Sequence, residues 1–210
     1  SLVNSPVPVF PCFGNHDCSS SVGESELDLI SKYQQHFGPV DYSFNIGKVH
    51  YVIVNDISFS RKNVKDKYSL GLEYWHYKWL ERDLQFVPKD HTIVICGHAQ
   101  LFRQFNKKDP DGKKNLSYAR YSKLLSQYAR VYSWSGHYHY NFGYDYANST
   151  NEAHEPLKNI ASICVARATG GLHCNRDLNN DGTPNGYMVM EVDGDKVEWY
   201  YKSIGKDRDY

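Results

Sequence analysis

The chain is organised around a stretch near its start, residues 7–17, which read Val-Pro-Val-Phe-Pro-Cys-Phe-Gly-Asn-His-Asp. The apolar run 7–12 predicts a short buried strand. The triplet Asn15-His16-Asp17 follows and places an amide oxygen, an imidazole and a carboxylate on one loop. Because open α/β sheets bind ligands at the carboxyl ends of their strands, we expect a functional site at this loop.

Two later segments repeat this arrangement. A strand predicted at 91–96 ends at Gly97-His98, and a strand predicted at 131–134 ends at Gly136-His137-Tyr138-His139. Histidine nitrogens together with an amide oxygen are ligands that divalent metals accept. The sequence therefore predicts a metal site with the ligands Asn15, His98, His137 and His139.

Helices and strands alternate up to residue 139. Apolar patterns predict helices over 24–37, 73–86 and 118–128, and a hairpin of 42–46 with 49–54. Residues 56–70 are expected to form a surface loop. The residues expected on the buried faces of the first two helices are Leu27, Ile30, Tyr33, Trp75, Trp79, Leu80 and Leu84. This order predicts a layered α/β fold with the histidines on one rim.

The pattern changes beyond residue 139. Turns rich in Gly, Asn and Asp separate strands predicted at 140–146, 160–169, 187–192 and 197–201. This part is expected to be an antiparallel β region that lies as a flap near the rim.

Composition excludes several classes of protein. The 210 residues carry 24 basic and 24 acidic side chains without a basic stripe, so nucleic acid is not an expected partner. No apolar run is long enough to span a bilayer, and no signal peptide is visible. Cys12, Cys96 and Cys164 lie in apolar runs and are expected to be buried free thiols. Cys18 and Cys174 lie in loops, where they could pair or stay free.

His16 and Asp17 are candidates for proton transfer. His16 adjoins Asn15 and cannot share its direction, and Asp17 could orient the imidazole. A histidine held by a carboxylate beside a metal is suited to protonating a leaving group. The alternative is that Asp17 caps a helix and His16 is structural. For His137 and His139, an extended segment directs the rings to opposite faces, whereas a bend directs both to one site.

The segments Gly14-Asn15-His16-Asp17, Gly97-His98 and Gly136-His137-Tyr138-His139, in this order, resemble the motifs of the calcineurin-like metallophosphoesterases. The resemblance covers residues 7–140. It implies part of a four-layer β-sandwich flanked by helices, followed by an antiparallel β module. It also implies two divalent ions among Mn, Fe, Zn and Ni that activate water to cleave phosphate mono- or diesters. It assigns Asn15, His98 and His137 to one metal and His139 to the other. It also implies that His16 contacts the phosphate and assists the leaving group, with Asp17 orienting it.

The tail is similar to the C-terminal module of bacterial three-part phosphoesterases, through residues 181–187, 191–194 and 199–202. The resemblance divides the chain into a catalytic part, residues 1–140, and a β-rich module, residues 141–210, that packs near the active-site rim. Proteins of this type are commonly exported, which implies a periplasmic or secreted location.

One part of the family pattern has no counterpart here. The family has an Asp-x-His and a Gly-Asp segment before Gly-Asn-His-Asp, and there is no room for them before residue 7. The expectation is therefore a truncated chain with an incomplete metal site and low activity, which needs the preceding part of its parent chain. Two alternatives stay open: a non-catalytic binding module, and a single-zinc hydrolase that uses Asn15, His98, His137 and His139.

The remaining polar residues carry weaker signals. Asp177, Asn179, Asp181 and Gly182 match the first half of a calcium loop, but Met188 stands where its glutamate belongs, which favours an Asx-rich turn. Arginine suits phosphate through its planar fork of donors. The residues that could face a substrate are Tyr138, Tyr140, Arg167, His173 and Arg176. The histidines without a motif are His36, His50, His76, His91 and His154.

Overall fold

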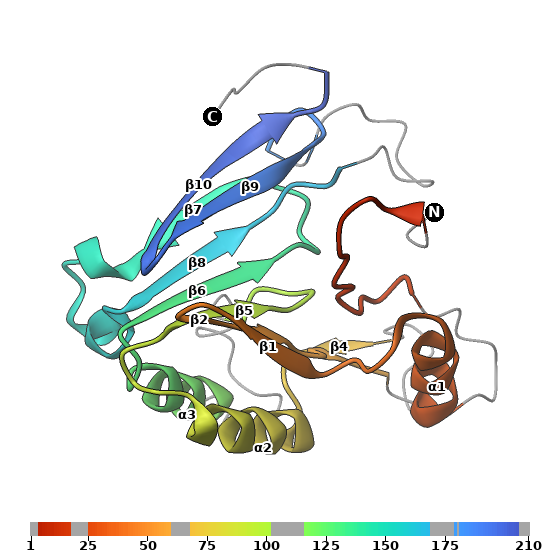
Figure 1. Ribbon diagram of the computed structural model, residues 1–210, viewed down its shortest axis with the longest axis horizontal. Coiled ribbons are helices and arrows are strands. Elements are labelled where there is room, and N and C mark those ends of the chain that lie inside the picture. Colours follow the sequence, from red (N-terminus) through yellow and green to blue (C-terminus); the bar gives the residue numbers. More distant parts are fainter. Residues whose placement is uncertain are drawn as a thin grey trace.

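A six-stranded sheet forms the middle layer of the molecule (Figure 1). In the computed structural model, which describes residues 4–17, 25–59, 68–101, 116–168, 179 and 181–205, the strand order is β1-β2-β5-β6-β8-β7. The strands are β1 (Tyr42–Ile46), β2 (Val49–Ile53), β5 (Thr92–Cys96), β6 (Arg130–Ser135), β8 (Ile160–Cys164) and β7 (Phe142–Asp145). Because β2, β5, β6 and β8 are parallel neighbours, their carboxyl ends form one edge of the sheet.

The two outer strands run antiparallel to this block. β1 and β2 form the predicted hairpin, which turns at Gly47 with a φ of 58°. β7 pairs with β8, which is itself parallel to β6. Residues beyond 140 therefore enlarge the main sheet before any separate antiparallel unit begins. The connection from β6 to β8 contains β7 and two short 3₁₀ helices, η4 (Tyr146–Asn148) and η5 (Glu152–Leu157), and is long enough for a parallel crossover.

The three predicted helices are confirmed as α1 (Glu26–Phe37), α2 (Tyr74–Asp83) and α3 (Leu116–Leu125), with α2 continuing into the 3₁₀ helix η2 (Leu84–Phe86). A capping box between Ser25 and Asp28 starts α1, because each side chain bonds to the other's backbone N–H. Gly38, with a φ of 85°, ends it. Within the described part of the chain, none of the helices has the length and hydropathy needed to cross a bilayer.

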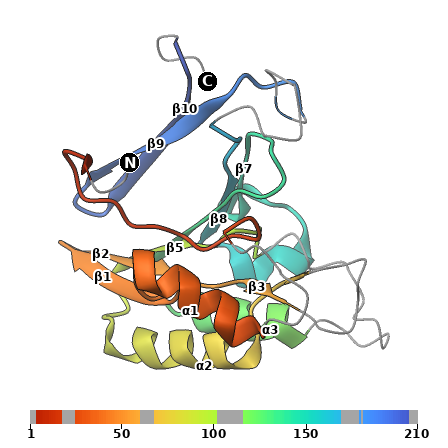
Figure 2. The same cartoon turned by 90° about the vertical axis from the view of Figure 1, so that its right-hand side faces the viewer.

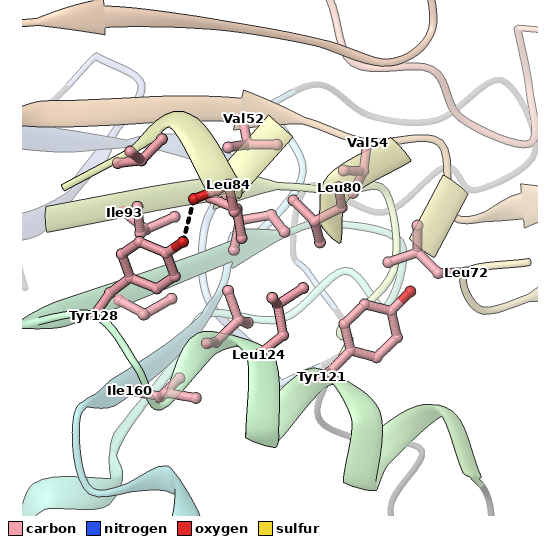
Figure 3. Close-up of a cluster of buried hydrophobic side chains, with 14 of the residues drawn as sticks. Val52, Val54, Leu72, Leu80, Leu84, Ile93, Tyr121, Leu124, Tyr128 and Ile160 are labelled. Atoms are coloured by element: carbon pink, nitrogen blue, oxygen red, sulfur yellow. Dashed lines mark hydrogen bonds between the residues drawn. The ribbon is translucent and has the colours of Figure 1, made fainter. Parts of the chain in front are cut away.

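Helices α2 and α3 cover one face of the sheet and bury the larger apolar cluster (Figure 3). Leu80 and Leu84 are fully buried there against Ile93 of β5 and Ile160 of β8, as the helical period predicts. The Tyr128 hydroxyl donates to the carbonyl oxygen of Leu84, so its polar end has a partner inside this core.

A hairpin of β9 (Gly186–Asp193) and β10 (Lys196–Ser203) covers the opposite face (Figure 2). Val197 is buried with Val94, Tyr132 and Ile163 of the sheet, and Trp199 packs against the same cluster. The molecule thus has three layers, with helices, sheet and hairpin in that order. This mixed α/β architecture agrees with the fold class expected from the sequence.

The strand predicted at 7–12 is wrong. These residues form no strand, and the side chains of Val7 and Phe10 are 63% and 50% exposed. Pro8 and Pro11 have no backbone N–H to donate to a sheet, which explains why the segment does not pair. Phe13, the next large side chain, is fully buried against Tyr33 of α1.

Three local expectations also differ from the structure. Leu27 is 75% exposed and Leu29 is buried in its place, because α1 turns the 29–33 stripe toward the core. Trp75 is 65% exposed. Residues 56–58 are not a surface loop, since Asp56 is buried and β3 (Ile57–Ser58) pairs with β4 (Ser69–Leu70). Residues 60–67 of that predicted loop lie outside the described residues.

Candidate metal centre

The three motif loops meet at the carboxyl edge of the parallel strands. His98 follows β5, His137 and His139 follow the neighbouring strand β6, and Asn15 lies on the amino-terminal segment. Figure 1 shows this segment, in red, beyond the arrowheads of β6 and β8. Sheet geometry therefore brings together side chains that lie far apart in the sequence.

Three donor atoms converge on one position. The Nε2 atom of His98 lies 2.7 Å from Oδ1 of Asn15 and 2.9 Å from Nδ1 of His137. One ring nitrogen carries either one proton or one lone pair, so it cannot form good hydrogen bonds with both neighbours. A divalent cation, in contrast, accepts lone pairs from two imidazoles and an amide oxygen together. The donor set thus fits a metal ion.

The histidines are held in the form that binds metal. Burial lowers the pKa of His98 from 6.5 to about 4, and repulsion from His137, His16 and His139 adds to this effect. Burial also lowers the pKa values of His137 and His139, and Arg167 contributes for His139. Neutral imidazole is the ligand form, so the rings need not lose a proton to bind a cation at neutral pH.

The His137–His139 loop is bent. His137 and His139 have φ values of 59° and 54°, in the left-handed region that few residues other than glycine adopt. The Tyr138 N–H donates to the Gly136 carbonyl at 2.6 Å and closes the turn. The extended geometry considered for this segment is wrong, and both rings line one cavity of about 390 Å³ together with His98 and Arg167. Strained backbone of this kind is frequent at functional sites.

The amino-terminal loop places His16 at the exposed side of this group. His16 is close enough for its charge to lower the pKa values of His98, His137 and His139. The Asp17 carboxylate accepts a hydrogen bond of 2.7 Å from the Gly14 N–H, and so holds the backbone of the loop. Orientation of the His16 imidazole by Asp17 stays a prediction.

Asp56 was missed by the sequence analysis. It follows β2 at the same edge of the sheet and is fully buried. Its carboxylate accepts hydrogen bonds from the backbone N–H groups of His98 and Ala99, at 3.0 and 2.7 Å. Burial raises its pKa to about 7, although these bonds oppose the rise. A signal was available, because Asp56 follows the apolar strand of 49–54 as His98 follows its own strand.

Two histidines without a motif, the buried His50 and the partly buried His76, pair with carboxylates outside this group of donor atoms. His50 contacts Asp83 and Asn45, both at 2.8 Å, and His76 contacts Asp41 at 2.6 Å. These contacts give the ring nitrogens hydrogen-bond partners within the scaffold, so the two histidines have a structural explanation.

The other candidates divide between the cavity and the turns. Arg167 lines the cavity, and its Nε donates to Oδ1 of Asn185 at 3.4 Å. The Asp181 carboxylate accepts from the Asn141 and Thr183 N–H groups, as expected for an Asx turn. Cys164 is buried, and its thiol donates to the Gly136 carbonyl oxygen at 3.2 Å, while Cys12 and Cys96 are half-buried free thiols. The candidates that lie outside the described residues are Cys18, His173, Cys174, Arg176 and Asp177.

Known proteins resemble the chain along nearly its whole length. A family model described as the C terminal of calcineurin-like phosphoesterase matches residues 162–210. Over 207 residues the chain is 24% identical to the serine/threonine-protein phosphatase CPPED1 of Pongo abelii and 23% identical to that of Homo sapiens. Each match covers 96% of this chain and 58% of the relative, so the chain spans little more than half of these relatives' length.

A solved structure has a similar fold. It is the purple acid phosphatase PPD1 from yellow lupin (Lupinus luteus) seeds, with a TM-score of 0.52 and 16% sequence identity, over 94% of this chain and 39% of that one. The fold class expected from the sequence is thereby confirmed. The curated relatives are mammalian and this neighbour is a plant protein, so the bacterial origin stays a prediction.

Proposed function

We propose that the chain hydrolyses phosphate esters at the rim where its histidine loops meet, because its C-terminal part matches a calcineurin-like phosphoesterase model and its curated relatives are phosphatases. The observation that carries the proposal is the convergence of Asn15 Oδ1, His98 Nε2 and His137 Nδ1 within hydrogen-bonding distance. The relatives are serine/threonine-protein phosphatases by name, which favours phosphate monoesters on protein side chains as the substrate class.

Asn15, His98 and His137 would hold one divalent ion, and His139 would contribute to a second. A divalent ion bound there neutralises phosphate charge and makes water a better nucleophile at neutral pH. The low pKa of His98 keeps the ring available as a ligand. The bend at His137 and His139 turns both imidazoles into the cavity that the phosphate would enter.

His16 and Arg167 would act on the substrate itself. His16 lies at the open side of the cluster, where its imidazolium can give a proton to the departing alkoxide oxygen. Asp17 holds the loop that carries His16 through the Gly14 N–H. Arg167 lines the cavity, and its guanidinium suits the phosphate oxygens.

The described residues supply few ligands for two ions. Among them, no group of three or more His, Cys, Asp or Glu side chains is placed to hold a metal. We therefore expect the 210-residue chain alone to bind metal weakly and to turn over slowly. A longer form of the protein that contains this chain should be faster on the same substrate.

The test measures hydrolysis of p-nitrophenyl phosphate, bis(p-nitrophenyl) phosphate and a phosphoserine peptide by the full-length protein, with Mn²⁺, Zn²⁺ or chelator. We expect metal-dependent release of phosphate from the monoesters. His137→Ala should reduce kcat/KM by at least about 100-fold, since it removes a ligand of the ion. His36→Ala, which alters an exposed histidine at the end of α1, is the matched control.

The same measurements separate the alternatives. Metal binding without hydrolysis of any ester would support the non-catalytic module and reject the proposal. One zinc ion per chain at full activity would reject the two-metal centre and support the single-zinc hydrolase.

A further inference from the structure

Asp56 makes its contacts with the loop that carries His98 and not with the His98 ring. Oδ1 accepts from the His98 N–H at 3.0 Å and Oδ2 accepts from the Ala99 N–H at 2.7 Å. The side chain has no exposed surface, so water does not compete for these bonds. The two adjacent N–H groups on one carboxylate hold the peptide planes on both sides of the His98 Cα atom.

The segment that carries Asp56 is itself held from several sides. The Gly71 N–H donates to the Asp56 carbonyl at 2.8 Å, and the Ile57 N–H donates to Oδ1 of Asn55 at 3.0 Å. The Asn55 N–H donates to Oδ1 of Asp41 at 2.8 Å, whose other oxygen contacts Nδ1 of His76 on α2. A chain of hydrogen bonds therefore connects the segment that carries the Asp56 carboxylate to helix α2.

The effect of Asp56 extends to the second histidine loop. The His98 carbonyl accepts a hydrogen bond of 2.9 Å from the Gly136 N–H, next to His137. On the other side, a Cβ on Gly97 would lie 2.8 Å from Oδ2 of Asp56. The absence of a side chain at Gly97 is what lets the loop close over the carboxylate.

We propose that Asp56 is a positioning residue that fixes the backbone at His98 and thereby directs its imidazole toward Asn15 and His137. The inference rests on the proposed function only in taking His98 as a metal ligand. Asp56 touches neither the ion nor the substrate. Its removal acts through the direction of His98.

The decisive variant is Asp56→Asn in the full-length protein. Asparagine keeps the shape and one acceptor, but its NH₂ group would face a backbone N–H, so one of the two bonds is lost. We expect the Kd for Zn²⁺, measured by titration calorimetry, to rise about 10–100-fold. Gly97→Ala should act in the same direction, because its new methyl displaces the Asp56 carboxylate.

Asp83→Asn is the matched control. Asp83 is a half-buried carboxylate with two side-chain partners, His50 of β2 and Ser43 of β1, neither of which belongs to the candidate site. If Asp56 positions His98, Asp56→Asn binds zinc more weakly than the wild type, whereas Asp83→Asn binds zinc as the wild type does. The melting temperatures of the two variants should be similar.

Unchanged zinc affinity in Asp56→Asn overturns the inference, and so does equal loss of affinity in both variants. The wild-type protein could bind zinc through His98, as judged by loss of binding in His98→Ala, and yet hydrolyse no ester. This result would reject the proposed function and leave the positioning role of Asp56 intact. Wild-type protein that binds no zinc overturns both.

Discussion

At the scale of single residues, Gly14 lies against the ring it helps to place. A Cβ at this position would be 2.7 Å from Nδ1 of His98, closer than side-chain atoms approach. We expect Gly14→Ala to displace the imidazole from Asn15 and His137 and to weaken zinc binding about tenfold or more. Gly136→Ala is the control in titration calorimetry, because its Cβ would meet only the His98 carbonyl at 3.9 Å. Equal affinities for the two variants would contradict this account.

Cys96 lines the same cavity and is nevertheless expected to be unreactive. Burial raises the pKa of its thiol to about 12, and only the thiolate attacks an alkylating reagent. Reaction with iodoacetamide at pH 8 should be slow in the native protein and should accelerate as the pH rises toward 12. Mass spectrometry measures the extent of Cys96 modification, with urea-unfolded protein as the reference. Fast modification of Cys96 in the native protein at pH 8 would show the prediction to be wrong.

The meeting of the candidate ligands His98 and His137 could be predicted from the sequence, whereas the burial of Asp56 could not, although its place after an apolar strand was a signal. His98 and His137 each end an apolar run, and parallel strands bring such ends together. Asp56 was assigned to a loop because polar residues follow it. Its burial depends on the short pair of β3 and β4, two strands of two residues each, which leave no periodic pattern in the sequence.

At the scale of elements, the β9–β10 hairpin depends on a glycine at its first paired position. A Cβ on Gly186 would lie 2.3 Å from the Lys202 carbonyl oxygen and 2.5 Å from the Tyr201 ring. We expect Gly186→Ala to lower the free energy of unfolding by about 1–3 kcal/mol. Urea denaturation measures this, with Gly143→Ala of β7 as control, where the nearest atom is 3.6 Å away. A larger loss in the control would refute the explanation.

Strands with two buried faces were predicted well, and the exceptions have physical causes. β5 is an unbroken apolar run because helices cover one face and the hairpin covers the other. Residues 7–12 share that composition but contain two prolines, which do not donate to a ladder. The parallel pairing of β8 with β6 depends on a long connection whose path has no local sequence signal.

At the scale of the whole molecule, Trp199 joins the hairpin to the sheet. Its ring centroid lies 5.5 Å from that of Tyr132 and 6.4 Å from that of Trp134. We expect Trp199→Ala to lower the free energy of unfolding by about 2–4 kcal/mol, because it removes a large packed ring from between two layers. Zinc affinity should stay unchanged, since the side chain does not line the cavity. If Trp199→Ala lost zinc binding but kept the wild-type free energy of unfolding, the view that Trp199 stabilises the fold without affecting the site would be wrong.

The continuity of the main sheet across residue 140 limits how the gene can be shortened. A protein ended after the last motif histidine would lack β8 and leave the outer edge of β6 with unpaired N–H and C=O groups. Such an edge is a template for other strands, so the shortened product should form aggregates in the expression host. A library of end points should therefore yield dispersed protein only where β8 is retained.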